Sequence, residues 1–90
     1  MLFVALMKVR AGTEEERMMR RLQWESPEGF KVVAEYWLHT HDPQVVVVFE
    51  SESFIPIAQL TSAWDDVFDI TVIPAITAED GLEMGRQMMV

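Results

Sequence analysis

Cysteine is absent from this chain, which excludes disulfide bonds, thiol catalysis and zinc–thiolate sites. Basic residues are few: 7 lysines and arginines stand against 15 acidic residues, giving a formal net charge of −8. Because phosphate contacts need clustered lysine and arginine, this balance argues against a nucleic-acid partner and against docking on anionic membranes. The longest apolar run is far shorter than the roughly 20 residues that span a bilayer. We therefore expect one cytoplasmic domain over residues 1–90.

The chain also lacks the motifs of nucleotide-binding and serine-hydrolase sites. The 4 glycines are scattered, so a phosphate-binding loop is missing, and a serine-hydrolase elbow is missing as well. The one basic cluster consists of Arg17, Arg20 and Arg21 and follows the three glutamates at positions 14–16. This spacing predicts ion pairs along a single helix and not an anion-binding patch.

The most informative feature that is present is an apolar run, Val45–Phe49. Four β-branched valines and a phenylalanine favour a strand. Successive side chains of a strand point to opposite faces of its sheet, so an unbroken apolar run predicts that both faces are buried. The stretch Met1–Met7 repeats the pattern and is also interpreted as a strand. A chain of 90 residues has few elements with which to cover both faces of a sheet, so the two runs predict a partner.

Periodicity and turn residues predict the remaining elements. Strands are expected at residues 2–9, 30–39, 44–50 and 68–76, and helices at residues 14–24, 54–64 and 78–90. Thr13 and Glu16 match a capping box, Ser53 is the expected N-cap of the second helix, and Thr77 with Asp80 predicts a cap for the third. Met18, Leu22 and Met19 form the expected apolar stripe of the first helix.

The second strand is expected to alternate between an apolar and a wetter face. One face would carry Phe30, Val32, Ala34, Tyr36 and Leu38, and the other Lys31, Val33, Glu35, Trp37 and His39. The methionines on the helices are interpreted as flexible core filler, in preference to a soft-metal site.

The element order β-α-β-β-α-β with a C-terminal helix predicts an α+β, ferredoxin-like fold. Its four-stranded antiparallel sheet has the order 4-1-3-2, which puts the two continuously apolar strands in the centre. The helices would cover one face, and the open face predicts a homodimer, since a second copy of the chain is the simplest cover for it.

Several segments, taken together, resemble a known family. Met1–Val4, Pro27–Gly29 and above all Trp64–Pro74 are similar to a small bacterial family catalogued as a domain of unknown function. That family is assigned to the dimeric α+β barrel proteins. The resemblance covers nearly the whole chain and implies the fold and a homodimer, but no established activity.

The wider superfamily includes muconolactone isomerases, quinone-forming monooxygenases and haem-degrading monooxygenases. The resemblance therefore implies cofactor-free isomerase or monooxygenase chemistry as one class of activity. The haem-degrading enzymes typically use asparagine, tryptophan and histidine, whereas this chain has no asparagine, so we expect no haem and no other cofactor.

His39 is the candidate catalytic residue, and His41, two residues later, is a candidate ligand contact. Their spacing puts two imidazoles on the same side of a strand, and Asp42 is adjacent. One interpretation is a general base at His39, or a metal site shared with His41. The other is a polar hairpin end with both side chains in water. A third metal ligand is not evident, so we expect no metal site.

The aromatic residues supply candidate ligand contacts. Tyr36, Trp37 and Trp64, with Glu35 and His41, are predicted to border a pocket between sheet and helices, together with Trp24. Core packing is the alternative, and the helical spacing of Trp64 favours it there. Two functions remain open at this point: binding of a small aromatic molecule with catalysis by His39, or a non-catalytic homodimeric interaction or sensing module.

Overall fold

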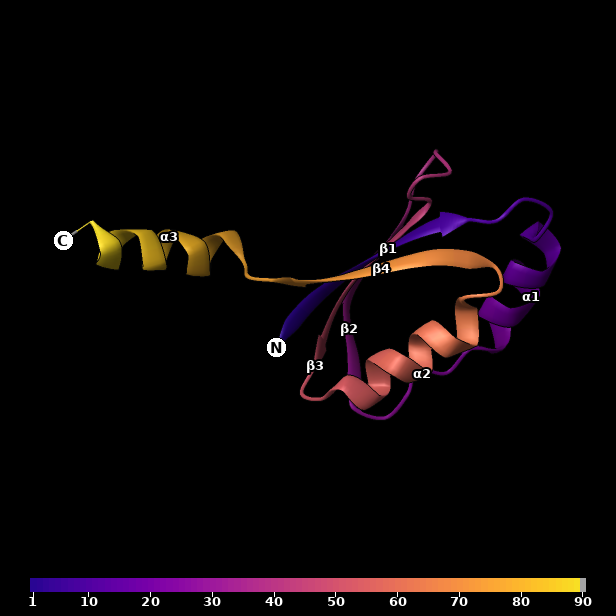
Figure 1. Ribbon diagram of the computed structural model, residues 1–90, viewed down its shortest axis with the longest axis horizontal. Helices are drawn as coiled ribbons and strands as arrows, with labels where there is room; N and C mark the ends of the chain where they lie inside the picture. The colour runs from indigo at the N-terminus through magenta and orange to yellow at the C-terminus, as the bar shows by residue number, and fades with distance from the viewer. Residues whose placement is uncertain (90) are drawn as a thin grey trace.

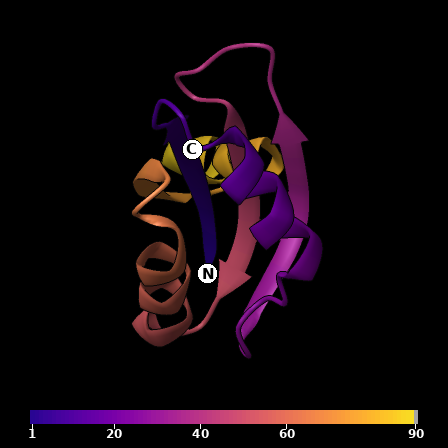
Figure 2. The same ribbon diagram turned by 90° about the vertical axis from the view of Figure 1, so that its right-hand side faces the viewer.

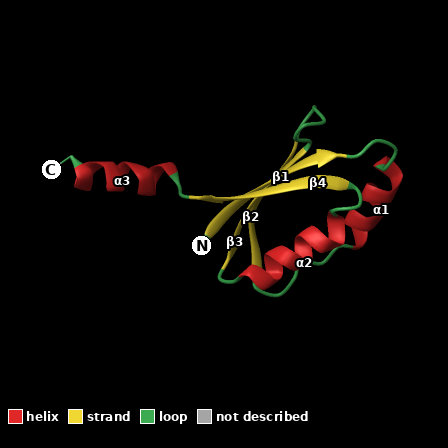
Figure 3. Ribbon diagram, in the orientation of Figure 1, coloured by secondary structure: helices red, strands yellow, loops and turns green. Residues whose placement is uncertain are grey.

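The computed structural model describes residues 1–89, and its elements follow the predicted order (Figure 1 and Figure 3). The strands are β1 (Leu2–Val9), β2 (Phe30–Trp37), β3 (Val45–Ser51) and β4 (Phe68–Ala75), and the helices are α1 (Glu14–Gln23), α2 (Phe54–Trp64) and α3 (Ala78–Met88). No helix in this part of the chain is long and apolar enough to cross a membrane.

The four strands form one antiparallel sheet in the order β2-β3-β1-β4, which confirms the predicted ferredoxin-like topology. The central position of β1 and β3 is also confirmed. Their register pairs Ala5 with Val47, and β4 adds Val72 on the other side of Ala5. Helices α1 and α2 lie on the same side of this sheet (Figure 2 and Figure 3).

A β-bulge in β2 corrects the predicted alternation. Val32 pairs with Phe49 and Ala34 with Val48, so the register shifts across Val33. An extra residue in one strand reverses the parity of the side chains beyond it. As a result, Phe30 and Val32 share the helix side of the sheet with Glu35 and Trp37, although they were expected on opposite faces.

The hydrophobic core lies between the sheet and α2. Its buried side chains are Ala5, Met7, Phe30, Val47, Phe49, Ile57, Leu60, Trp64, Val67 and Phe68. Phe49 is fully buried and stacks on Phe30, with ring centroids 4.1 Å apart. Every second residue of the valine run therefore enters this core, while Val46 and Val48 point to the other side.

Helix α1 differs most from expectation, because none of its residues is buried. Leu22, part of the predicted apolar stripe, is 77% exposed. The predicted capping box is also wrong: the Thr13 hydroxyl donates to the Arg10 carbonyl oxygen at 2.7 Å and accepts from Arg17 Nε at 2.9 Å. Ser53 is the N-cap of α2 by position, but its side chain makes no cap hydrogen bond.

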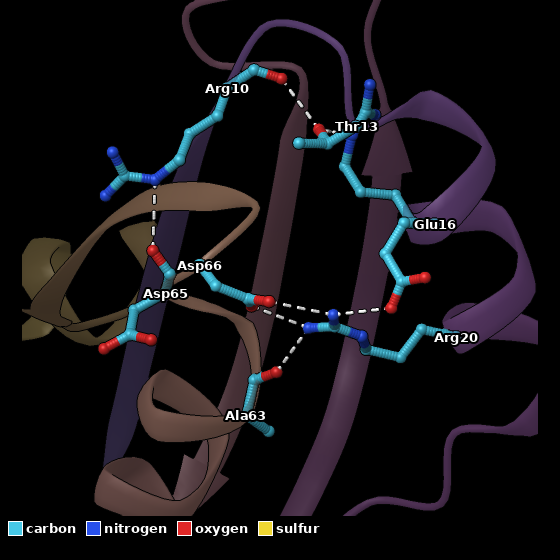
Figure 4. Close-up of polar contacts among 8 residues, drawn as sticks. Arg10, Thr13, Glu16, Arg20, Ala63, Asp65 and Asp66 are labelled. Atoms are coloured by element: carbon cyan, nitrogen blue, oxygen red, sulfur yellow. Dashed lines mark hydrogen bonds and ion pairs between the residues drawn. The ribbon is translucent and has the colours of Figure 1, made fainter.

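Polar contacts of arginine attach α1 to the body instead (Figure 4). Arg20 Nη1 donates to the Ala63 carbonyl oxygen and to Asp66 Oδ1, both at 2.7 Å. Its Nη2 donates to Asp66 Oδ2 at 3.0 Å and to Glu16 Oε1 at 2.7 Å. The guanidinium also lies 5.3 Å from the centre of the Trp64 ring, a cation–π distance. One side chain thus joins α1 to the C-terminal end of α2.

Two parts of the structure carry apolar side chains that nothing covers within residues 1–89. The first is the side of the sheet opposite α1 and α2, which we call the open face; it carries Leu2, Val4, Leu6, Ala34, Tyr36, Val46, Val48, Ile73 and Ala75. The second is α3, which extends away from the sheet at the end opposite α1 (Figure 1). The predicted cap of α3 is confirmed, since Thr77 Oγ1 accepts from the Asp80 amide at 3.0 Å.

The methionines of the helices are exposed in this chain, which contradicts their interpretation as core filler within one chain. Met7, which lies on strand β1 and not on a helix, is buried in the core. The exposed ones are Met18, Met19, Met84, Met88 and Met89.

The Arg20 contacts predict a pH-dependent contribution to stability. The hydrogen bond from Arg20 lowers the pKa of Asp66 below its ordinary value of 3.8. A carboxylate with a depressed folded-state pKa stabilises the fold fully above its unfolded-state pKa and loses that effect as the pH falls through the folded-state pKa. We expect Asp66→Asn to lower the free energy of unfolding at pH 7, and the difference from wild type to shrink below pH 3.8.

Urea unfolding across that pH range measures the difference. Asp65→Asn is the matched control, because the Asp65 carboxylate has no ion pair among residues 1–89. A loss of stability in Asp66→Asn that persists unchanged to the most acidic pH, or equals that of the control, would contradict the assignment.

Candidate functional site

A cavity of about 540 Å³ lies between α1, α2 and the helix side of the sheet. It exists because α1 rests on arginine side chains and does not pack its own apolar residues against the sheet. Its floor is apolar and is formed by core residues: Met7, Phe30, Val47, Leu60, Trp64 and Phe68. A volume of several hundred cubic ångströms with apolar walls is typical of small-molecule sites.

All 3 tryptophans of the chain line this cavity, although they come from different segments. Trp64 lies at the end of α2, Trp24 directly follows α1, and Trp37 ends β2. Trp24 and Trp64 meet edge to face, with ring centroids 5.5 Å apart. Trp64 was expected either to pack in the core or to border a pocket. The buried side chain packs in the core and also lines the cavity, so both expectations apply.

Polar groups lie on the opposite wall, around the ends of β2 and α1. Glu35 accepts hydrogen bonds from Arg21 Nη2 at 3.1 Å, Arg21 Nε at 3.3 Å and Trp37 Nε1 at 2.7 Å. Both carboxylate oxygens are used, and the side chain is only 21% exposed. Glu35 therefore fixes the position of Trp37 and of α1 against β2.

A second polar contact joins α1 to the loop before β3. Arg17 Nη1 donates to Gln44 Oε1 at 2.7 Å, and the guanidinium lies 5.6 Å from the centre of the Phe68 ring. Arg17 and Gln44 both line the cavity, with Glu14 and Met18 on the same side of α1.

The structure brings some of the predicted site residues together and separates others. Glu35, Trp37, His39 and Trp64 line the cavity. Tyr36 pairs with Val46 on the open face and is 59% exposed, so it points away from the cavity.

His41 is not among the lining residues, and its carbonyl oxygen accepts from the Val9 amide at 3.2 Å. Strand β2 ends at Trp37 and not at His39, so the two histidines lie in the loop and do not share a strand face. Within residues 1–89, no three histidine, aspartate or glutamate side chains converge as a metal site would require.

Sequence reasoning missed the arginines of the cavity. Arg17 and Arg21 were expected to pair with the glutamates of their own helix, but only Arg20 does so, with Glu16. Their spacing was the available signal: residues four apart share one helix face. Gln44 gave no signal, because its role depends on the approach of the loop to α1.

Comparison with known proteins identifies a family. A family model described as "Domain of unknown function (DUF3303)" matches residues 1–89, and the chain belongs to that family. No curated protein and no solved structure matches the chain.

Proposed function

We propose that this protein binds a small, ring-containing molecule in the cavity beneath α1. The observation that carries the proposal is the convergence of all 3 tryptophans on one cavity of about 540 Å³. Tryptophan faces provide large flat contact areas for a planar ligand. The polar groups are few and lie on one side, as in sites where apolar walls supply affinity and a few polar atoms orient the ligand.

The proposed chemistry needs no cofactor. His39 lines the cavity at its exposed edge, and histidine is the residue that most often transfers protons in enzymes. Glu35, in contrast, has both oxygens occupied by Arg21 and Trp37, so it acts as a positioning group. Under this proposal, His39 exchanges a proton with the bound molecule, as an isomerase or a cofactor-free monooxygenase requires.

Filling the cavity tests the binding proposal. Met18→Trp puts a large ring at the cavity wall, and we expect it to weaken binding of the neutral aromatic probe 2-naphthol by about tenfold or more, by occupying the same space. Isothermal titration calorimetry measures the affinity.

Met19→Trp is the matched control, because Met18 and Met19 are adjacent on α1 and are 47% and 56% exposed, but only Met18 lines the cavity. We expect the control to bind 2-naphthol as wild type does. Equal affinities for both variants, or no binding of 2-naphthol to wild type, would contradict the proposed site.

A second proposal concerns assembly: the protein is a homodimer joined through the open face. This surface carries apolar side chains on all four strands, with charged residues (Lys8, Asp69, Lys31 and Glu50) at its ends, and monomeric proteins rarely expose a large contiguous apolar patch. A second copy of the chain offers the same apolar surface, which suits a two-fold interface. The non-catalytic interaction module, the alternative function, would use this dimer without a ligand.

Two adjacent valines of β3 allow the core and the proposed interface to be tested separately, because their side chains point to opposite faces of the sheet. Val47 is 6% exposed and lies in the core, whereas Val46 points to the open face. We expect Val47→Glu to unfold the protein, because burying an unpaired carboxylate, or protonating it so that it can be buried, lowers the free energy of unfolding by several kcal/mol. Val46→Glu should keep the circular dichroism spectrum of a folded chain but sediment as a monomer of 10.4 kDa.

Wild type should sediment at twice that mass. Sedimentation equilibrium at micromolar concentration makes the measurement. A monomeric wild type, or a Val46→Glu variant that remains a dimer, would overturn the proposed interface.

A further inference from the structure

We infer that the molecule bound in the cavity carries an anionic group, such as a carboxylate on an aromatic ring, and that Arg17 binds this group. The inference rests on the proposed function and names the ligand class for the same cavity.

Arg17 differs from every other arginine between residues 1 and 89 in its partners. Arg20, Arg21, Arg10 and Arg86 each form an ion pair with a carboxylate. Arg17 makes none there, and its two side-chain hydrogen bonds go to neutral oxygens, Thr13 Oγ1 and Gln44 Oε1. A shortage of acids does not explain this, since the chain has 15 acidic residues against 7 basic ones.

Arg17 lies in the wall of the cavity, so the absence of a carboxylate partner within residues 1–89 leaves its charge available to a ligand. The side chain is half-buried, lines the cavity and lies over the Phe68 ring at 5.6 Å. A guanidinium has five N–H donors, of which Nε and one on Nη1 are used here. Glu14 lines the same cavity three residues earlier, but it is exposed and has no ion pair in this part of the chain.

The guanidinium of Arg17 is held in one orientation, so it can recognise the shape of an anionic group as well as its charge. Thr13 and Gln44 hold the guanidinium from two sides, so its remaining donors are oriented before a ligand arrives. A guanidinium matches a carboxylate through two parallel hydrogen bonds. The apolar floor beside it, which includes Phe68 and Trp64, would receive the ring of the same molecule.

Two probes that share a ring system but differ in charge test the inference. We expect wild type to bind 2-naphthoate roughly 10- to 100-fold more tightly than neutral 2-naphthamide, the range typical of a charge-assisted hydrogen bond. Arg17→Gln should remove most of this preference by weakening 2-naphthoate alone, and Arg17→Lys should retain part of it. Isothermal titration calorimetry gives all the affinities.

Arg86→Gln is the control, since it removes the same charge from α3, away from the cavity. It should leave both affinities unchanged. Equal binding of the two probes to wild type, or an unchanged preference in Arg17→Gln, would overturn the anionic ligand and leave the cavity as a binding site. If neither probe binds, the proposed function fails together with this inference. Thermal unfolding of each variant verifies that it is folded.

A different observation, the position of α3, carries a second inference: α3 packs against the partner protomer. The radius of gyration is 15.1 Å, whereas a compact chain of this length has about 12 Å. The accessible surface is 6545 Å², about 1,100 Å² more than the roughly 5,400 Å² typical of a monomer of 10.4 kDa. A stable protein interface buries about 800 Å² on each partner, so the excess is large enough to supply one interface.

Helix α3 also lacks the means to be stable alone. It has 11 residues, contains Gly81 and Gly85, and buries none of its side chains in this chain. Isolated helices shorter than about 12 residues are marginal in water, and each glycine costs roughly 1 kcal/mol relative to alanine. Leu82, 63% exposed, shares one side with Met89, and Glu79 and Arg86 flank it at three and four residues' distance. Asp80, Glu83 and Gln87 lie on the opposite side. A second copy of the chain is the proposed occupant, because it would cover both α3 helices at once.

In the proposed dimer each α3 packs against the other protomer, an arrangement we call the exchange of α3. Adding a negative charge to one side of α3 or to the other tests it. We expect Leu82→Glu to raise the dimer dissociation constant by about tenfold or more, because the new charge loses water in the interface. Gln87→Glu adds the same charge to the polar side and should change it little. Sedimentation equilibrium measures both, and unchanged dimerisation of Leu82→Glu would overturn the role of α3.

Mixed dimers of labelled and unlabelled chains distinguish exchange from folding back. Isotope-filtered nuclear Overhauser contacts between Leu82 methyl groups and unlabelled protein are expected. Contacts of Leu82 only within its own chain would overturn the exchange, while a monomeric Val46→Glu variant would still support the sheet interface.

Discussion

The contacts of Arg20 between α1 and the end of α2 determine how closely α1 approaches the sheet, and therefore whether a cavity remains between them. Arg20 reaches the Ala63 carbonyl and Asp66 with a long side chain, so α1 is held at a distance from the sheet. An apolar stripe in the same place would have brought the helix down onto the core and filled the space. Because α1 is attached through polar contacts at its edge, a cavity of about 540 Å³ remains beneath it.

The open face and α3 are both left uncovered by the other elements of residues 1–89. The central strands β1 and β3 carry apolar side chains on both faces of the sheet, yet α1 and α2 cover only one of these faces. The elements of residues 1–89 form no second layer over the open face. The proposed dimer would cover the open face and α3 together, and it would leave the cavity on the outer side of each subunit.

Much of the fold could be predicted from the sequence, because local patterns and topology agree for most elements. The valine run identified β3 as central, and the Thr77 cap identified the start of α3. The bulge at Val33 was not predictable, since nothing in the alternation of Phe30–Trp37 distinguishes a bulged residue from a regular one. The site was predicted in part: Trp37 and Trp64 line one cavity, but the bulge and the turn decide where Tyr36 and His41 point.

The central claim is that the cavity beneath α1 is a ligand site, and the 3 tryptophans allow a direct measurement. In a ¹H–¹⁵N correlation spectrum, each indole N–H gives its own signal. Titration with 2-naphthoate should shift the signals of Trp24, Trp37 and Trp64 together and leave the backbone amides of Val46 and Val48 unmoved. Unshifted indole signals, or shifts confined to the open face, would contradict the account.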